Sequence, residues 1–138
     1  MNREMLLLLF VAQLGNASAT GESDRVGGKA LPTNAVLICD EHVVGEASGK
    51  PMHIDWQAYG LHEETEKVMQ FYQSQFGRPS ASDKGGQSST WTFKGEYNEL
   101  QYSVKAASAD GPWVKCAKQP TGYKAVVFIS NAIWKYGR

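Results

Sequence analysis

The segment MHIDWQAYGLHEETEKVMQFYQSQFGRP, residues 52–79, decides the fold class of this 138-residue chain. Its first seven residues alternate between apolar and polar side chains, and this period of two predicts a half-buried strand. The apolar members are Met52, Ile54, Trp56 and Ala58, and the polar members are His53, Asp55 and Gln57. The polar set is expected to form the solvated face of this strand.

A helix is predicted directly after this strand, because Gly60 interrupts the alternation and a different period follows. Three glutamates stand near the start of the helix, where its dipole favours negative charge. The apolar residues recur at steps of three and four and form one stripe, made of Val68, Phe71, Tyr72 and Phe76. Gly77 is expected to cap the helix, and Pro79 prevents it from resuming.

Four further strands are predicted from apolar and β-branched runs at residues 36–39, 90–94, 100–106 and 124–135. The last run is apolar on both faces at residues 125–129, which is typical of a central strand. Short connections between the late strands favour antiparallel pairing. We therefore expect an α+β fold in which one amphipathic helix packs on a curved antiparallel sheet of about five strands.

The first nineteen residues have the pattern of a secretory signal peptide. An apolar run at residues 6–12 precedes Ala17-Ser18-Ala19, which fits the small-x-small cleavage pattern. The run is shorter than the roughly 20 residues that span a bilayer, so no transmembrane anchor is expected. Residues 20–34 are predicted to be a flexible leader and residues 35–138 a single α+β domain. The predicted location is therefore extracellular or periplasmic.

Charge and motifs exclude several classes of function. The 14 basic and 14 acidic residues balance, which gives no support for nucleic-acid binding. The chain has neither a Gly-x-Ser-x-Gly elbow nor a Walker-type phosphate loop. No cofactor is predicted.

The only two cysteines are Cys39 and Cys116. In an oxidising compartment an even count favours pairing, and a bridge across so long a loop contributes about 4 kcal/mol on the chain-entropy model. The alternative is a metal site, because Cys39 and His42 have a Cys-x-x-His spacing that suits zinc. A structural zinc site needs four ligands, and no second closely spaced pair is present. We therefore predict a disulfide and no metal.

His53 and Asp55 are the candidate catalytic residues. Two positions apart on a strand, they share a face, and a carboxylate beside an imidazole can orient it as a general base. The nucleophile would have to come from the serine-rich loop at residues 80–89. The candidate ligand-binding residues are Trp113 and Tyr123, since aromatic side chains in the long loop before the last strand offer a platform for a ligand.

The sequence favours a small secreted domain that binds a small ligand or a protein partner, without catalysis and stabilised by one disulfide. Two alternatives stay open. One is a small exported hydrolase that uses His53 and Asp55, and the other is a secreted metal-binding protein that uses Cys39, His42 and nearby acids.

Overall fold

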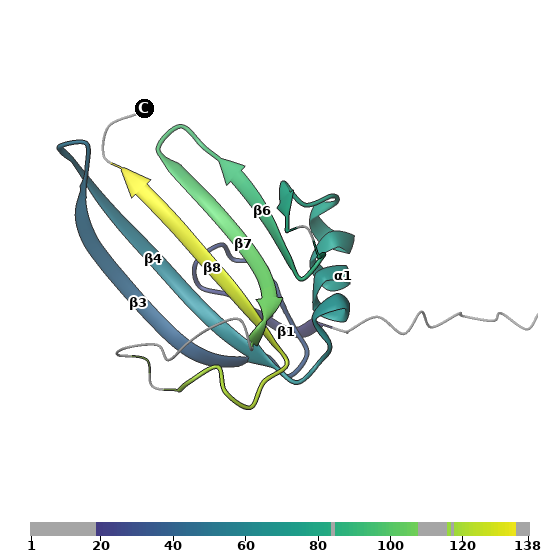
Figure 1. The fold of residues 1–138 in the computed structure, drawn as a ribbon. Coiled ribbons are helices and arrows are strands. Elements are labelled where there is room, and N and C mark those ends of the chain that lie inside the picture. The colour runs from purple at the N-terminus through teal and green to yellow at the C-terminus, as the bar shows by residue number, and fades with distance from the viewer. Residues whose placement is uncertain (1–18, 84, 108–115, 117, 135–138) are drawn as a thin grey trace, which may run out of the picture.

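The computed structural model describes residues 19–83, 85–107, 116 and 118–134. Its elements are β1 (Ala19–Ser23), β2 (Ala30–Pro32), β3 (Val36–Ala47), β4 (Lys50–Leu61), α1 (Thr65–Phe76), β5 (Ala81–Ser82), β6 (Ser88–Lys94), β7 (Asn98–Ala106) and β8 (Ala125–Trp134). Six strands form one open sheet in the order β3-β4-β8-β7-β6-β5, and β1 pairs with β2 (Figure 1). Neighbouring strands are antiparallel. The α+β class is confirmed, with a sheet larger than predicted.

Helix α1 forms where the apolar stripe predicts it. The stripe is buried or packed against one core, through Val68, Phe71, Tyr72 and Phe76. The helix ends at Gly77, whose backbone N–H donates to the carbonyl of Gln73 at 2.8 Å. The Trp91 indole N–H donates to the Gly77 carbonyl at 2.9 Å. A buried side chain from β6 therefore satisfies a backbone group at the helix end.

Strands β3 and β4 form a hairpin much longer than the first strand predicted at residues 36–39. Their pairing runs from Val36 and Gly60 to Ala47 and Lys50. Ser48 and Gly49 make the two-residue turn with φ angles of 52° and 76°; positive φ at both positions matches the twist of a tight hairpin. Most of β3 beyond residue 39 is exposed at the sheet edge. This part of β3 is polar because it is exposed, and the strand continues through it to Ala47.

Strand β8 lies inside the sheet, between β4 and β7, as its apolar run predicts. Its buried members are 0% exposed: Ala125, Val126, Val127 and Ile129. The hairpin predicted from the two preceding runs is also present, since β6 pairs with β7. The sixth strand, absent from the prediction, is β5, which has only two residues at the sheet edge.

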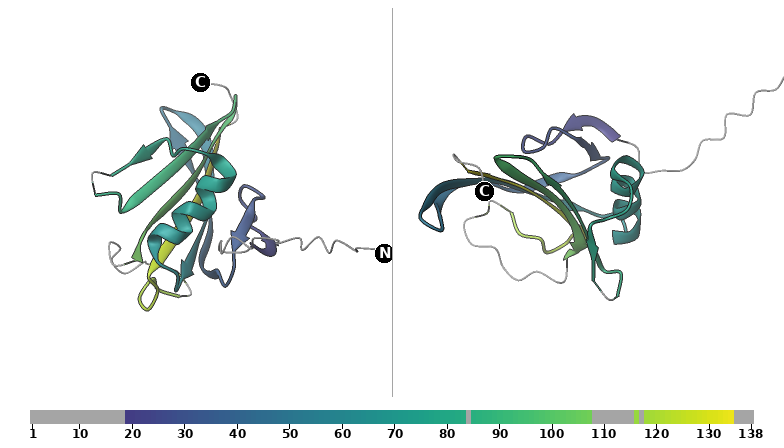
Figure 2. Two further views of the ribbon diagram at one scale, coloured as in Figure 1. Left: turned by 90° about the vertical axis from the view of Figure 1, so that its right-hand side faces the viewer. Right: turned by 90° about the horizontal axis from the view of Figure 1, so that it is seen from above.

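The two faces of the sheet are covered by different parts of the chain. Helix α1 and the β1–β2 hairpin lie on the same face, as Figure 2 shows. The main core on this face includes Tyr59, Tyr102 and Ile129. A smaller core includes Ile38 and Ala58 together with Cys39. Helix α1 lies toward β6 and β7, away from the β3–β4 hairpin (Figure 1).

Residues 20–34, predicted to be a flexible leader, include most of the β1–β2 hairpin. Asp24 in its turn is 2% exposed, and Leu31 in β2 is 3% exposed and part of the main core. Gly27 and Gly28 lie in the turn between the two strands, where their backbone N–H groups donate to the Asp24 carboxylate. Residues 1–18 lie outside the described part of the chain, so the signal peptide stays a prediction. Within the described residues, no helix has the length and apolarity needed to cross a membrane.

Candidate functional site

The two candidate catalytic residues lie on β4 and share a face of the sheet, as expected. His53 Nε2 is 3.9 Å from Asp55 Oδ2, which is beyond hydrogen-bond distance. Both side chains are about two-fifths exposed, at 39% and 40%. The pair is therefore accessible to solvent, and its carboxylate is available to a second partner.

That second partner is His42, which is not one of the candidate catalytic residues predicted from the sequence. His42 lies on β3 directly opposite Asp55, and its Nδ1 is hydrogen-bonded to Asp55 Oδ1. The rings of His42 and His53 have centroids 5.1 Å apart. We call His42, His53 and Asp55 the histidine cluster. A signal existed in the sequence, because a two-residue turn at residues 48–49 fixes the pairing of residues 42 and 55.

The histidine cluster borders a groove of about 400 Å³. The groove is lined by Arg25, Val26, Asp40, Glu41, His42 and Asp55. One wall therefore comes from the turn of the β1–β2 hairpin, and the other from β3 and β4. Arg25 forms an ion pair with Asp40 across it. Three carboxylates and one guanidinium line the groove, so the lining has a formal excess of negative charge when His42 is neutral.

Asp24 fixes the wall that carries Arg25. Its carboxylate accepts backbone N–H bonds from Gly27, from Gly28 at 3.1 Å and from Lys29 at 3.0 Å. The Tyr102 hydroxyl donates to the same carboxylate at 2.8 Å. Burial, and then this hydrogen bond to Asp24, raise the pKa of the Tyr102 hydroxyl. The turn is thus bonded to a fully buried side chain of β7.

Gln57 makes a second attachment between the turn and the sheet. Its side-chain oxygen accepts the Arg25 backbone N–H at 3.1 Å and the Tyr59 hydroxyl at 2.9 Å. Gln57 is 1% exposed, whereas the alternation in β4 predicted it on the solvated face. That prediction was wrong because the β1–β2 hairpin covers this part of the face. Asp55 stays accessible because it lies two residues closer than Gln57 to the β3–β4 turn, beyond the part of β4 that the β1–β2 hairpin covers.

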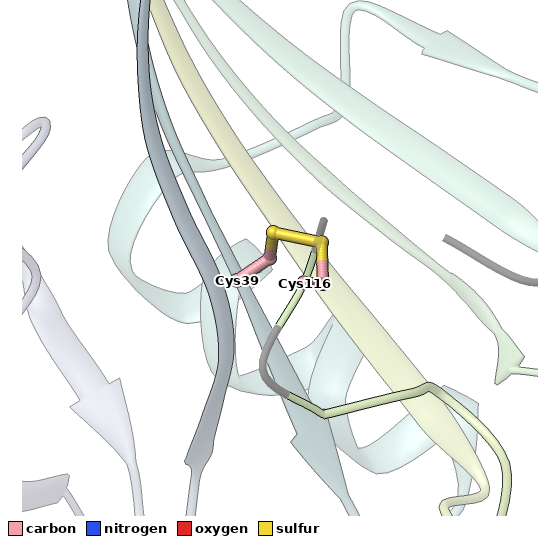
Figure 3. Close-up of a disulfide and its surroundings, with 2 residues drawn as sticks. All are labelled: Cys39 and Cys116. Carbon is pink, nitrogen blue, oxygen red and sulfur yellow. A yellow bond between two sulfur atoms is a disulfide. The ribbon is translucent and has the colours of Figure 1, made fainter. Parts of the chain in front are cut away.

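The predicted disulfide links Cys39 and Cys116, with their Cα atoms 4.9 Å apart (Figure 3). Both sulfurs are therefore engaged, and Cys39 offers no thiolate to a metal. His42 is three positions further along β3 and faces the opposite side of the sheet, where it meets Asp55. The Cys-x-x-His spacing thus does not assemble a metal site in this oxidised form.

The serines proposed as a source of nucleophile lie far from the histidine cluster. Ser82 and Ser89 belong to β5 and β6, where their hydroxyls are 3.5 Å apart. Strands β5 and β6 are at the opposite edge of the sheet from β3. Among the described residues that line the groove, there is no serine, threonine or cysteine. The structure does not bring the imidazoles together with the predicted nucleophiles.

The aromatic ligand-binding candidates are separate from the groove. Tyr123 covers Gly60, where a Cβ atom would lie 2.6 Å from the tyrosine ring. Its ring stacks on His62 with centroids 4.9 Å apart. These contacts give Tyr123 a packing role, and its part in ligand binding stays a prediction. Trp113 lies outside the described residues.

Comparisons of this chain with protein-family models, with curated proteins and with solved structures find no match. The groove and the histidine cluster are therefore the features that indicate a function.

Proposed function

We propose that the protein is an exported, non-catalytic binding domain whose ligand site is the groove between the β1–β2 turn and the β3–β4 hairpin. The observation that carries this proposal is the convergence of charged side chains from two distant segments on one groove. A charged, accessible lining on firmly attached walls is suited to a polar ligand. The excess of carboxylates favours a ligand with positive charge.

The fixed walls support binding because they lower its entropic cost. Asp24 and Gln57 hold the turn against the sheet through buried hydrogen bonds. Arg25 and Asp40 are therefore presented from positions that need little rearrangement when a ligand arrives. Preorganisation of this kind increases affinity without any new contact.

Binding is favoured over covalent hydrolysis because the described groove lining lacks a hydroxyl or thiol nucleophile. The His42–Asp55 contact resembles the imidazole–carboxylate pair of a general base. A nucleophile must lie within hydrogen-bond reach of that base for covalent catalysis. No serine, threonine or cysteine is among the described residues that line the groove.

A titration of the oxidised, isotope-labelled protein with a panel of small ammonium, guanidinium, carboxylate and phosphate compounds tests this proposal. Followed by NMR, a cationic member should shift the backbone amides of Arg25, Asp40 and His42 together. The matched variants are Asp40→Asn, which should weaken binding, and Asp83→Asn, an exposed carboxylate outside the groove lining, which should not. Shifts confined to the Tyr123 region, or equal losses in both variants, would contradict the assignment.

The exported state is tested on protein recovered from its source. The expected mass is that of residues 20–138 less two hydrogens. A retained initiator methionine would contradict export with cleavage, and two free thiols would contradict the disulfide. The hydrolase alternative requires turnover of p-nitrophenyl esters or phosphates that His53→Ala abolishes in a folded protein.

A further inference from the structure

We infer that the histidine cluster binds one divalent transition-metal ion of the kind that prefers imidazole, such as Zn²⁺ or Cu²⁺. This inference deepens the proposed function and rests on it, because the ion would occupy one wall of the same groove. The protein ligands would be an imidazole nitrogen from each of His42 and His53 and a carboxylate oxygen of Asp55. The site is independent of the cysteines, which are bridged on the other side of β3.

Two separations within the histidine cluster are close to those around a metal ion, and side-chain rotation must still bring the three ligand atoms to one point. For bonds of the usual length, two ligand atoms of a tetrahedral zinc ion lie about 3.3 Å apart. The observed separation between His53 Nε2 and Asp55 Oδ2 is 3.9 Å. Two imidazoles on one tetrahedral zinc ion have ring centroids about 5 Å apart. The rings of His42 and His53 have centroids 5.1 Å apart.

The backbone already places the ligands, so only side-chain rotation is needed. His42 and Asp55 are direct cross-strand partners. His53 is paired with Val44, and both lie two residues closer to the turn, on the same face of the sheet. The His42 imidazole would exchange its hydrogen bond with Asp55 for a bond to the ion. All three side chains are accessible, with exposed fractions of 57% for His42, 39% for His53 and 40% for Asp55.

The surroundings favour a cation at this position. Asp40 and Glu41 line the groove beside the cluster, and Arg25 is the one cationic side chain in the lining. Arg25 is itself paired with Asp40, whose negative charge offsets that of the guanidinium. Three protein ligands leave a coordination position for water, and imidazole with carboxylate is a ligand set that suits zinc and copper.

The experiment is a calorimetric titration of Zn²⁺ into the oxidised full-length chain without a polyhistidine tag. We expect one ion per chain, and affinity at least about ten-fold weaker in each of His42→Gln, His53→Gln and Asp55→Asn. The matched control is His62→Gln, since His62 is exposed and stacks on Tyr123 outside the cluster. Cu²⁺ electron paramagnetic resonance should show coupling to two imidazole nitrogens in the unaltered protein and to one in His53→Gln.

Two outcomes would overturn the inference, provided that circular dichroism shows each variant folded. One is the absence of Zn²⁺ binding to the unaltered protein at millimolar concentration. The other is an equal loss of affinity in His62→Gln and in the cluster variants. If organic cations still shift the groove amides in the NMR titration, the proposed binding function survives and only the metal assignment fails. If neither probe binds, both proposals fail.

Discussion

Asp24 is buried in the turn that carries one wall of the groove and Asp55 lines the other wall, and the surroundings of the two carboxylates differ completely. Asp24 is 2% exposed, and its carboxylate accepts hydrogen bonds from three backbone amides and the Tyr102 hydroxyl. The Asp55 side chain is 40% exposed and contacts two imidazoles. The same chemical group is structural where its bonding capacity is used internally, and available for a ligand where solvent can reach it.

The largest expected effect comes from raising the pH, which ionises the buried tyrosines around Asp24. Burial raises the pKa of Tyr59, Tyr72 and Tyr102, with the charge of Asp24 adding to it. The unfolded chain therefore releases these protons near pH 10, before the folded protein does. Their contribution to stability is complete below about pH 10 and is lost as the pH rises beyond it.

Circular dichroism and tyrosinate absorbance, recorded together during an alkaline titration, check this expectation. The late-ionising tyrosines should ionise in the same pH interval in which the fold is lost. Ionisation of all tyrosines near pH 10 in a protein that stays folded would show that the hydroxyls are accessible, and would remove the contrast between the two regions.

Removing the buried carboxylate is the next largest effect. Asp24→Ala leaves three backbone amides and the Tyr102 hydroxyl without their acceptor, and should lower the free energy of unfolding by about 3 kcal/mol. Asp55→Ala, on the exposed wall, should change it by less than about 1 kcal/mol. Urea denaturation of both variants measures the difference. Similar losses in the two variants would show that exposure does not distinguish these aspartates.

A methyl group at Gly27 should disturb the contact between the β1–β2 turn and Tyr102 of β7. A Cβ atom at this position would overlap the Tyr102 hydroxyl, whereas one at Gly45 on β3 would meet nothing within 4 Å. Gly27→Ala is therefore expected to cost about 2 kcal/mol, as overpacking does. Gly45→Ala is the control, with little effect expected. Thermal unfolding compares the pair, and a stable Gly27→Ala protein would mean that the turn moves freely.

The smallest effects separate two buried tyrosines. Tyr102 donates to Asp24, so Tyr102→Phe should cost about 1.5 kcal/mol. The Tyr72 hydroxyl is buried without a hydrogen-bond partner among the described residues, so Tyr72→Phe should be neutral or stabilising. Urea midpoints at neutral pH measure both. An equal cost in the two variants would indicate that the Tyr72 hydroxyl has a bonding partner after all.

The parts of the fold that follow local patterns were predicted from the sequence. The apolar stripe gave α1 and its end at Gly77, and the run at residues 125–129 identified β8 as central. The two cysteines gave the disulfide. The helix and the central strand follow from the spacing of apolar residues along a short segment. The disulfide follows from the count of two cysteines.

The parts that depend on long-range packing were missed. Gln57 has the pattern of a solvated residue in β4, and only the β1–β2 hairpin, far away in the sequence, buries it. Asp24 follows the same logic, since its partner Tyr102 is 78 residues away. His53 and Asp55 were found because they share one strand. His42 was missed because its place opposite Asp55 follows from the pairing register and has no periodic signal.

The position of β8 between β4 and β7 has a consequence for the order of events during biogenesis. The β3–β4 hairpin and the β6–β7 hairpin can join one sheet only through a strand that ends at Trp134. A growing chain can therefore complete this sheet only after β8, Ala125–Trp134, has been made, long after the β3–β4 hairpin. Until then the β3–β4 and β6–β7 hairpins stay separate, and the edges of β4 and β7 that β8 later covers stay open to other pairing.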